Sequence, residues 1–127
     1  MKLVLDTSVL VDHLRGDPRA RDLLVGAIER GDELWSVTVV RTEVLAGVRG
    51  GEEPETLDLL GGIRWQDVTV EVADLAGTFA RRYLRSHPGV DLADYLIGAT
   101  TEILQAELKT LNVRHFPMFP GLAPAYA

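Results

Sequence analysis

The fold class that this sequence predicts is an α/β domain with a mainly parallel central sheet. Short apolar segments with strand character alternate with longer amphipathic segments along the chain, which is typical of parallel sheets flanked by helices. The 127 residues fit one domain, 1–127, and no repeat, linker or low-complexity stretch divides them. With 46% hydrophobic residues the chain can bury a core without disulfide bonds.

Four segments have the composition of buried strands. Leu3, Val4 and Leu5 are continuously apolar, as expected of a central parallel strand covered on both faces. The predicted strands are 2–5, 34–37, 64–68 and 108–111.

Helix boundaries are marked by capping residues, prolines and glycines. Asp17-Pro18 and Glu53-Pro54 are helix starts, because proline suits the first turn and a carboxylate can accept from free backbone N–H groups there. The predicted helices, including their first capping residue, are 8–14, 17–29, 38–46, 53–61, 69–86 and 91–107. The tail, 116–127, is rich in proline and glycine, and we expect it to fold back over the surface.

Composition restricts the chemistry. The chain has no cysteine, which excludes disulfides and thiolate metal sites and fits a cytoplasmic location. Charged residues interrupt every apolar run, so we expect neither a signal peptide nor a membrane span. The net charge of −6 disfavours nonspecific binding to nucleic acid. It is compatible with an enzyme that meets phosphate through metal ions.

The first candidate site residue, Asp6, directly follows the predicted central strand. Ligands of open α/β sheets bind at the carboxyl ends of strands, so Asp6 is well placed to hold a metal, with Thr7 and Ser8 beside it as supporting polar groups. A plain helix N-cap is the alternative for Asp6.

Two further acids lie in predicted helices. Glu43 sits at the margin of an apolar stripe, where an unpaired charge is costly, although a solvated surface glutamate remains the alternative. Asp94 begins an otherwise apolar helix and shares a face with Asp91. A capping pair explains Asp91 well and Asp94 less well.

A fourth position follows the last predicted strand. Asn112 can face the same sheet end as Asp6 and offers an amide oxygen, a weaker ligand for a hard cation. Thr110 could hydrogen-bond a water on the metal. The alternative for Asn112 is an ordinary turn residue.

Convergence of these groups would create a site for Mg²⁺ or Mn²⁺, because ligand sets made only of oxygen favour these ions over Zn²⁺. Such a site suits hydrolysis of a phosphodiester bond. Spacing alone leaves the convergence open.

Four segments give the chain a wider resemblance. They are LVLDTSVLV from Leu3, TEVLAG from Thr42, DLADYLIGAT from Asp91 and TLNVRHFP from Thr110. In this order and at this length, they resemble the PIN-domain ribonucleases, and within them the VapC-type toxins of prokaryotic toxin–antitoxin pairs.

The resemblance implies a three-layer sandwich of helices around a parallel sheet, RNA cleavage that depends on Mg²⁺ or Mn²⁺, a homodimer, and inhibition by a cognate VapB-type antitoxin. Asp6, Glu43 and Asp94 match the family's three principal acids. Asn112 stands where many members carry a fourth acid, a departure that Asp91 could compensate. An antitoxin would place an Arg or Lys among the acids and apolar residues in a groove between the early helices.

Other functions fit less well. A phosphoaspartyl phosphatase requires a second Asp where Ser8 stands, and a receiver domain requires paired acids where Thr7 follows Asp6. A catalytically weak or inactive PIN-fold interaction protein remains the alternative, because Asn112 is neutral.

The remaining candidates have ordinary structural explanations. The basic residues Arg81, Arg82 and Arg85 form a solvated helix face or a contact for RNA phosphates, and the first is favoured. His115 is expected in a turn or in packing rather than in catalysis, and both tryptophans are expected in the core.

Overall fold

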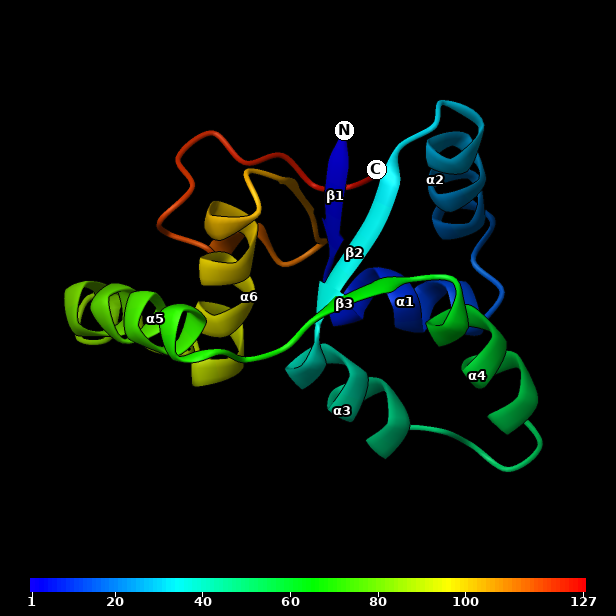
Figure 1. Cartoon of the computed structure of the whole chain (residues 1–127), viewed down its shortest axis with the longest axis horizontal. Helices are drawn as coiled ribbons and strands as arrows, with labels where there is room; N and C mark the ends of the chain where they lie inside the picture. The colour runs from blue at the N-terminus through cyan, green and yellow to red at the C-terminus, as the bar shows by residue number, and fades with distance from the viewer.

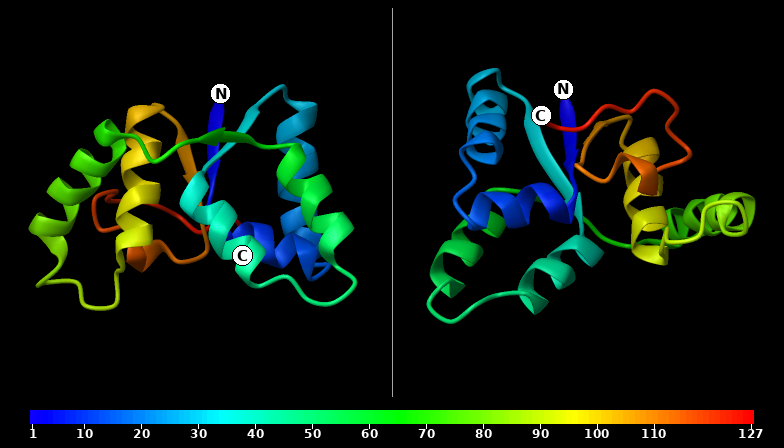
Figure 2. Two further views of the ribbon diagram at one scale, coloured as in Figure 1. Left: turned by 60° about the horizontal axis from the view of Figure 1, so that its bottom comes forward. Right: turned by 180° about the vertical axis from the view of Figure 1, so that it is seen from behind.

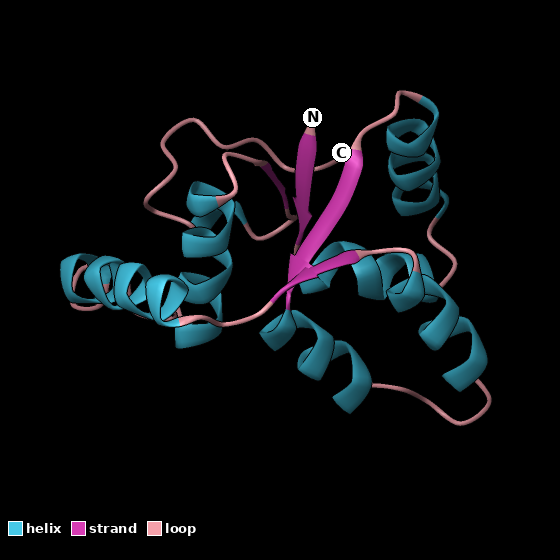
Figure 3. Cartoon of the chain, in the orientation of Figure 1, coloured by secondary structure: helices cyan, strands magenta, loops and turns pink.

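A computed structural model describes all 127 residues of the chain. Its centre is a four-stranded, fully parallel sheet in the order β3-β2-β1-β4, which confirms the predicted fold class. The strands are β1 (Lys2–Leu5), β2 (Glu33–Val37), β3 (Arg64–Gln66) and β4 (Glu107–Lys109). Figure 3 shows the strands in magenta between the helices.

Six helices and one short 3-10 helix complete the chain. They are α1 (Thr7–Leu14), α2 (Pro18–Glu29), α3 (Thr38–Ala46), α4 (Glu53–Gly61), α5 (Val70–Tyr83), α6 (Leu92–Ile103) and η1 (Val113–His115).

Helices flank the sheet in two groups. Helix α6, with α5 outside it, lies on one side, whereas α1, α2 and α4 lie on the other (Figure 1). The two views in Figure 2 keep this separation and place α3 below the sheet, beyond the carboxyl end of β2. The arrangement is the predicted sandwich of helices around a parallel sheet.

The core is centred on β1. Leu3, Val4 and Leu5 are at most 2% exposed, because helices cover both faces and strands flank both edges. A second, smaller cluster lies between α5 and α6 and includes the fully buried Tyr95. No helix has the length and apolar character needed to cross a membrane.

Several predicted boundaries were wrong. The α6 helix ends at Ile103, four residues before the predicted end, because Gln105 adopts a left-handed backbone with φ of 52°. The N–H of Ala106 then bonds to the carbonyl of Thr101 at 3.0 Å, as in a Schellman motif. Glycine usually occupies that left-handed position, so the sequence carried no stop signal.

Smaller corrections apply elsewhere. Helix α3 begins with Thr38 itself and has no side-chain cap, whereas Thr38 was the expected cap. Helix α5 ends at Tyr83, before the predicted end at 86. Strand β3 stops at Gln66 instead of 68, and β4 spans Glu107–Lys109 instead of 108–111.

The C-terminal tail folds back, as predicted. The N–H of Ala125 donates to the carbonyl of Thr110 at 2.8 Å, next to the end of β4. The Tyr126 hydroxyl donates to Oδ2 of Asp12 on α1 at 2.7 Å. The tail therefore joins β4 to the opposite side of the molecule.

Candidate active site

One polar cavity lies at the carboxyl edge of the sheet. Its volume is about 330 Å³. It is lined by Asp6, Thr7, Ser8, Val11, Glu43, Asp91, Asp94, Asn112 and His115. Four separate parts of the chain therefore meet there: the end of β1 with α1, the helix α3, the start of α6, and the turn after β4.

Asp6 is the most firmly held of the acids. It is 4% exposed and caps α1, with Oδ1 accepting from the N–H of Thr7 at 2.8 Å. Its Oδ2 accepts from the Ser8 hydroxyl at 2.9 Å and from the Thr110 hydroxyl at 2.6 Å. Asp6 is therefore a helix N-cap, as the alternative interpretation predicted. This role does not exclude a metal site, because the same carboxylate lines the cavity.

Glu43 reaches the cavity from α3. It is an exposed residue, and its Oε1 accepts from the Thr7 hydroxyl at 2.7 Å. This bond ties α3 to the start of α1, which also carries Asp6. Thr7 and Ser8 therefore each orient one acid.

Asp91 and Asp94 form a reciprocal capping box at the start of α6. The N–H of Asp94 donates to Oδ1 of Asp91 at 3.0 Å, and the N–H of Asp91 donates to Oδ2 of Asp94 at 3.1 Å. The predicted capping pair is therefore present, and both acids still line the cavity. The box fixes the Asp94 carboxylate relative to the helix axis.

The surroundings of Asp94 destabilise its charged form. Burial, together with the nearby carboxylates of Asp91 and Asp6, raises the pKa of Asp94 to about 6, against the lowering effects of the Asp91 N–H and of His115. The lowering effect of His115 therefore does not offset burial and the two like charges. A cation in the cavity would stabilise the charged form.

The turn after β4 supplies Thr110 and Asn112. Thr110 is fully buried, and its hydroxyl accepts from the Asn112 N–H at 2.9 Å while donating to Asp6. Asn112 precedes η1 without making a side-chain cap, so its amide is free to serve the cavity that it lines.

His115 lies in η1, in agreement with the expected turn position. It also lines the acidic cavity, where its Nδ1 lies 3.2 Å from Oδ2 of Asp94. The only feature of the sequence that pointed to this location was its place three positions after Asn112, in the segment TLNVRHFP.

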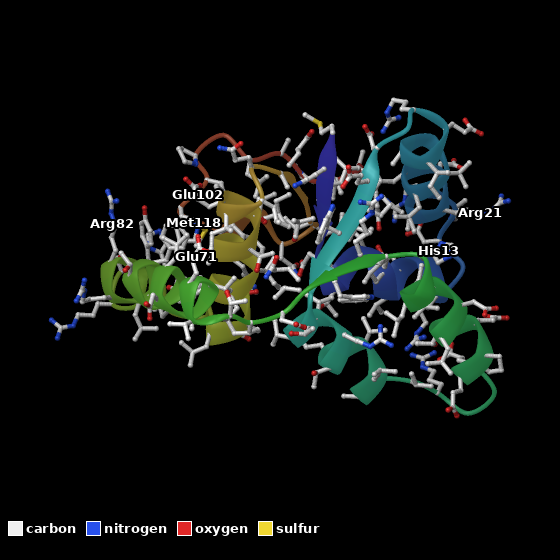
Figure 4. The ribbon with its side chains drawn as sticks, in the orientation of Figure 1. His13, Arg21, Glu71, Arg82, Glu102 and Met118 are labelled. Atoms are coloured by element: carbon white, nitrogen blue, oxygen red, sulfur yellow. The ribbon has the colours of Figure 1, made fainter.

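Arg81 and Arg82 of α5, and Arg85 just after this helix, do not line this cavity. Figure 4 places Arg82 at the outer end of α5, away from the sheet. The solvated reading of Arg81, Arg82 and Arg85 therefore fits the structure, since all three are exposed. The tryptophans Trp35 and Trp65 pack partly buried against the main core.

The donor set fits a hard cation that keeps most of its water ligands. Four carboxylates and one amide line the cavity, but no three acidic or histidine side chains converge closely enough to enclose an ion by themselves. Mg²⁺ usually keeps several waters and uses only one or two carboxylates. The arrangement therefore fits a largely hydrated Mg²⁺ better than a fully enclosed ion.

Comparison with known proteins gives one family. The PIN domain model matches residues 3–116. Ribonuclease VapC19 of Mycobacterium tuberculosis is 48% identical over 126 residues, covering 99% of this chain and 100% of that protein. Ribonuclease VapC10 of the same organism is 45% identical, covering 98% of this chain and 93% of that protein.

Solved structures with the same fold are more distant in sequence. A VapBC2 complex from Rickettsia felis, bound to a DNA fragment from its promoter, aligns with a TM-score of 0.79 at 19% identity, covering 98% of this chain and 97% of that chain. A toxin–antitoxin complex from Klebsiella pneumoniae aligns with a TM-score of 0.77 at 23% identity, covering 98% of both chains. At such identities the likeness concerns the fold.

Proposed function

Since this chain belongs to the PIN-domain family, with VapC ribonucleases as full-length relatives, we propose that residues 1–127 form one PIN domain that acts as a VapC-type toxin. Its activity is the hydrolysis of RNA phosphodiester bonds. The observation that carries the proposal is the meeting of Asp6, Glu43 and Asp94 in one cavity at the carboxyl edge of a parallel sheet.

The cofactor in this proposal is Mg²⁺, with Mn²⁺ as a substitute. Asp6, Asp94 and Glu43 would hold a largely hydrated ion, in part through its bound waters, and Asp91 or Asn112 would provide a further ligand. A cation held there would supply a nucleophile at neutral pH and would offset the charge that develops on the phosphate. The raised pKa of Asp94 supports this assignment, because a nearby cation would remove the strain that burial and like charges create.

The chain's own side chains prepare the acids for this task. Thr110 and Ser8 hold Asp6 in one orientation, and Thr7 holds Glu43. Polar groups that fix the ligands of a metal typically matter for its affinity and for activity. We therefore assign Thr7, Ser8 and Thr110 as positioning residues.

His115 stands between Asp94 and solvent. With a side chain 43% exposed and Nδ1 3.2 Å from Oδ2 of Asp94, it orients that carboxylate from the outer side of the cavity. We give it no proton-transfer role, since the cation already supplies a nucleophile at neutral pH.

A second candidate function rests on Asn112. A neutral amide at this place weakens the cation site, so an interaction protein with little or no nuclease activity is the alternative. Cleavage of RNA by the purified protein would exclude it.

The partner in this proposal is a VapB-type antitoxin. A free ribonuclease would harm its own host, so it requires a tight inhibitor. A largely apolar groove of about 210 Å³ is suited to an antitoxin segment. Its walls include Leu24, Val25 and Ile28 of α2 and Leu59 of α4.

Helix α1 connects this groove to the acids. Its residue His13 lines the groove, whereas Thr7 and Val11 line the acidic cavity. A segment that lies along the groove can therefore extend over α1 and place an Arg or Lys among the carboxylates. Arg suits this position because its guanidinium meets carboxylates in a bidentate way.

We also propose that the toxin is a cytoplasmic homodimer. A small apolar groove between α5 and α6 includes Ala76, Gly77 and Leu92 in its walls. Leu92 is 67% exposed, and the buried Tyr95 hydroxyl on the same groove has no hydrogen-bond partner. A second copy would cover this apolar surface. Because a Cβ at Gly77 would meet open space, Gly77→Arg should shift the protein from dimer to monomer in light scattering without unfolding it.

Expression in a bacterial host tests the toxin activity. We expect the native chain to arrest growth, Asp6→Asn to be harmless at equal protein level, and coexpression of the neighbouring antitoxin gene to restore growth. A native chain that accumulates without any effect on growth would contradict the toxin function.

A further inference from the structure

Three cavities lie in a row along one side of the active site. The acidic cavity shares His115 with a second cavity of about 360 Å³, whose walls also include His87, Gly89, Val90 and Arg114. The second cavity shares His87 and Arg114 with a third, which is lined mainly by residues of the C-terminal tail. Because the second cavity shares wall residues with both others, it adjoins the first and the third.

The charge changes sign between the first cavity and the second. Four carboxylates line the acidic cavity, whereas none lines the second, where Arg114 is the permanent charge. The Arg114 side chain is exposed and makes no ion pair or hydrogen bond within the chain, unlike Arg15, which pairs with Glu52 at 2.9 Å. In an acidic protein, an unpaired guanidinium beside a carboxylate-lined site is free to bind an anionic ligand.

His87 is held in place between the second and third cavities. The Ser86 hydroxyl donates to the carbonyl of Tyr83 at 3.3 Å and lies 2.8 Å from Nδ1 of His87. These contacts fix the orientation of the imidazole ring, because Ser86 occupies Nδ1 while Nε2 has no hydrogen-bond partner within the chain. The ring also meets Tyr83 edge-on, with centroids 5.5 Å apart.

We propose that the second cavity is a substrate subsite, which binds the nucleotide next to the scissile phosphate of a single-stranded RNA. The Arg114 guanidinium contacts the phosphate of that nucleotide, and Nε2 of His87 forms a hydrogen bond with a ribose hydroxyl. The inference rests on the proposed ribonuclease function, because it takes the acidic cavity as the place of cleavage.

An RNA strand fits this row of cavities for a chemical reason. The scissile phosphate belongs at the acids, where a cation offsets the repulsion, and the adjoining phosphate has no such cation. A fixed positive side chain must meet it instead, and Arg is the side chain best suited to phosphate. The ribose 2′-hydroxyl is the group that distinguishes RNA from DNA at such a contact.

The test combines one protein variant with one substrate change. Arg114→Ala and the native protein are compared on RNA oligonucleotides in which single phosphates, one position at a time, are replaced by neutral methylphosphonates. The matched control is Arg21→Ala. Arg21 is equally exposed, makes no ion pair, and lies on α2 on the far side of the sheet (Figure 4). Both oligonucleotide affinity and the cleavage rate are measured with Mg²⁺ present.

The expected result is a single sensitive position beside the cleaved bond. There, the neutral phosphate should weaken binding by the native protein about tenfold, and Arg114→Ala should weaken binding of the unmodified RNA by a similar factor. The two changes together should weaken binding little more than either change alone, because they remove the same contact. Arg21→Ala should behave as the native protein does.

Two measurements separate this proposal from the function on which it rests. If the native protein cleaves RNA and Arg114→Ala binds every oligonucleotide as the native protein does, the subsite is wrong while the ribonuclease function stands. If no RNA is cleaved but the effects of Arg114→Ala and of one neutral phosphate on affinity are still not additive, the contact between Arg114 and that phosphate stands and the ribonuclease function is wrong. Absence of both cleavage and coupling would overturn both.

Discussion

The Thr110 hydroxyl donates a 2.6 Å hydrogen bond to Oδ2 of Asp6 across 104 positions of sequence. The bond is buried and joins the residues that follow β4 and β1, two neighbouring parallel strands. It shows how the sheet positions the central acid: strand pairing brings the two strand ends together, and one hydroxyl then fixes the carboxylate.

Removing that hydroxyl should reduce activity. Thr110→Val keeps the shape but leaves Asp6 with one donor fewer and the Asn112 N–H without its acceptor. We expect a loss of roughly tenfold to a hundredfold in metal affinity or turnover and about 1–3 kcal/mol of stability. Titration of RNA cleavage with Mg²⁺, alongside thermal unfolding, measures both.

Thr101→Val is the matched control for Thr110→Val. Thr101 is also buried, but its hydroxyl donates to the carbonyl of Ile97 within α6, outside the cavity. This variant should lose stability at most and keep the native metal titration. If both threonine variants shift the titration equally, Thr110 has no specific role in positioning Asp6.

Asp94→Asn should be inactive and more stable than the native protein when metal is absent. Burial raises the pKa of Asp94 from 3.8 to about 6, so the folded state holds a proton that the unfolded state releases. Between about pH 4 and 6 this makes native stability fall as pH rises. An asparagine does not titrate, so this pH dependence is absent in Asp94→Asn. The free energy of unfolding of the variant should equal that of the native protein below pH 4 and exceed it by about 1–2 kcal/mol above pH 6.

Denaturant unfolding in EDTA across this pH range tests the Asp94 prediction. Asp74→Asn, an exposed change on α5, is the control and should alter stability little at any pH. A stability difference between native protein and Asp94→Asn that stays constant from pH 4 to 7 would contradict the prediction.

Asn112→Asp should strengthen metal binding. The amide makes no side-chain cap and lines the acidic cavity, so a carboxylate there adds a charged ligand. We expect a lower Mg²⁺ concentration at half-maximal cleavage, whereas Asp91→Asn should raise it if Asp91 compensates in the native protein. An unchanged titration in both variants would indicate that neither position contributes a ligand.

The antitoxin groove predicts a specific loss of binding. Val25 and Val68 are both 41% exposed, but only Val25 lines the groove. Val25→Glu should weaken the complex with the antitoxin by tenfold or more, because it buries a charge against apolar partner residues. Val68→Glu should leave the affinity unchanged in calorimetry, and equal effects of the two changes would place the antitoxin elsewhere.

The antitoxin's own basic residue allows a separate check. Replacing the inserted Arg or Lys should weaken inhibition more than it weakens complex formation, since the groove contacts remain. Equal losses of both would show that no basic side chain enters the acidic cavity.

The sequence was sufficient for the sheet and for part of the site. Asp6 follows a strand of continuous apolar character and Asn112 follows the last predicted strand, and parallel strands place their carboxyl ends at one edge. Their common location followed from that rule. Glu43 was different: its place at the margin of an apolar stripe made it a candidate, but no pattern of spacing predicts that α3 reaches this edge. Its assignment to the site came from the family resemblance.

Other features depend on contacts that leave little trace in sequence. The left-handed Gln105 ends α6 without a glycine, and the interpretation extended the helix through a strand residue. His115 was undervalued because its role arises from its distance to Asp94, a residue of another element. The groove between α5 and α6 likewise requires the packed structure.

The most direct test of the central claim is cleavage of a defined RNA by highly purified protein, measured with Mg²⁺, with EDTA, and with Mg²⁺ restored. We predict cleavage that EDTA abolishes and Mg²⁺ restores in the native protein, with rates lower by orders of magnitude in Asp6→Asn and Asp94→Asn despite native folding. RNA cleavage that persists in EDTA, or that both variants carry out at the native rate, would contradict the assignment of these acids as a metal-dependent active site.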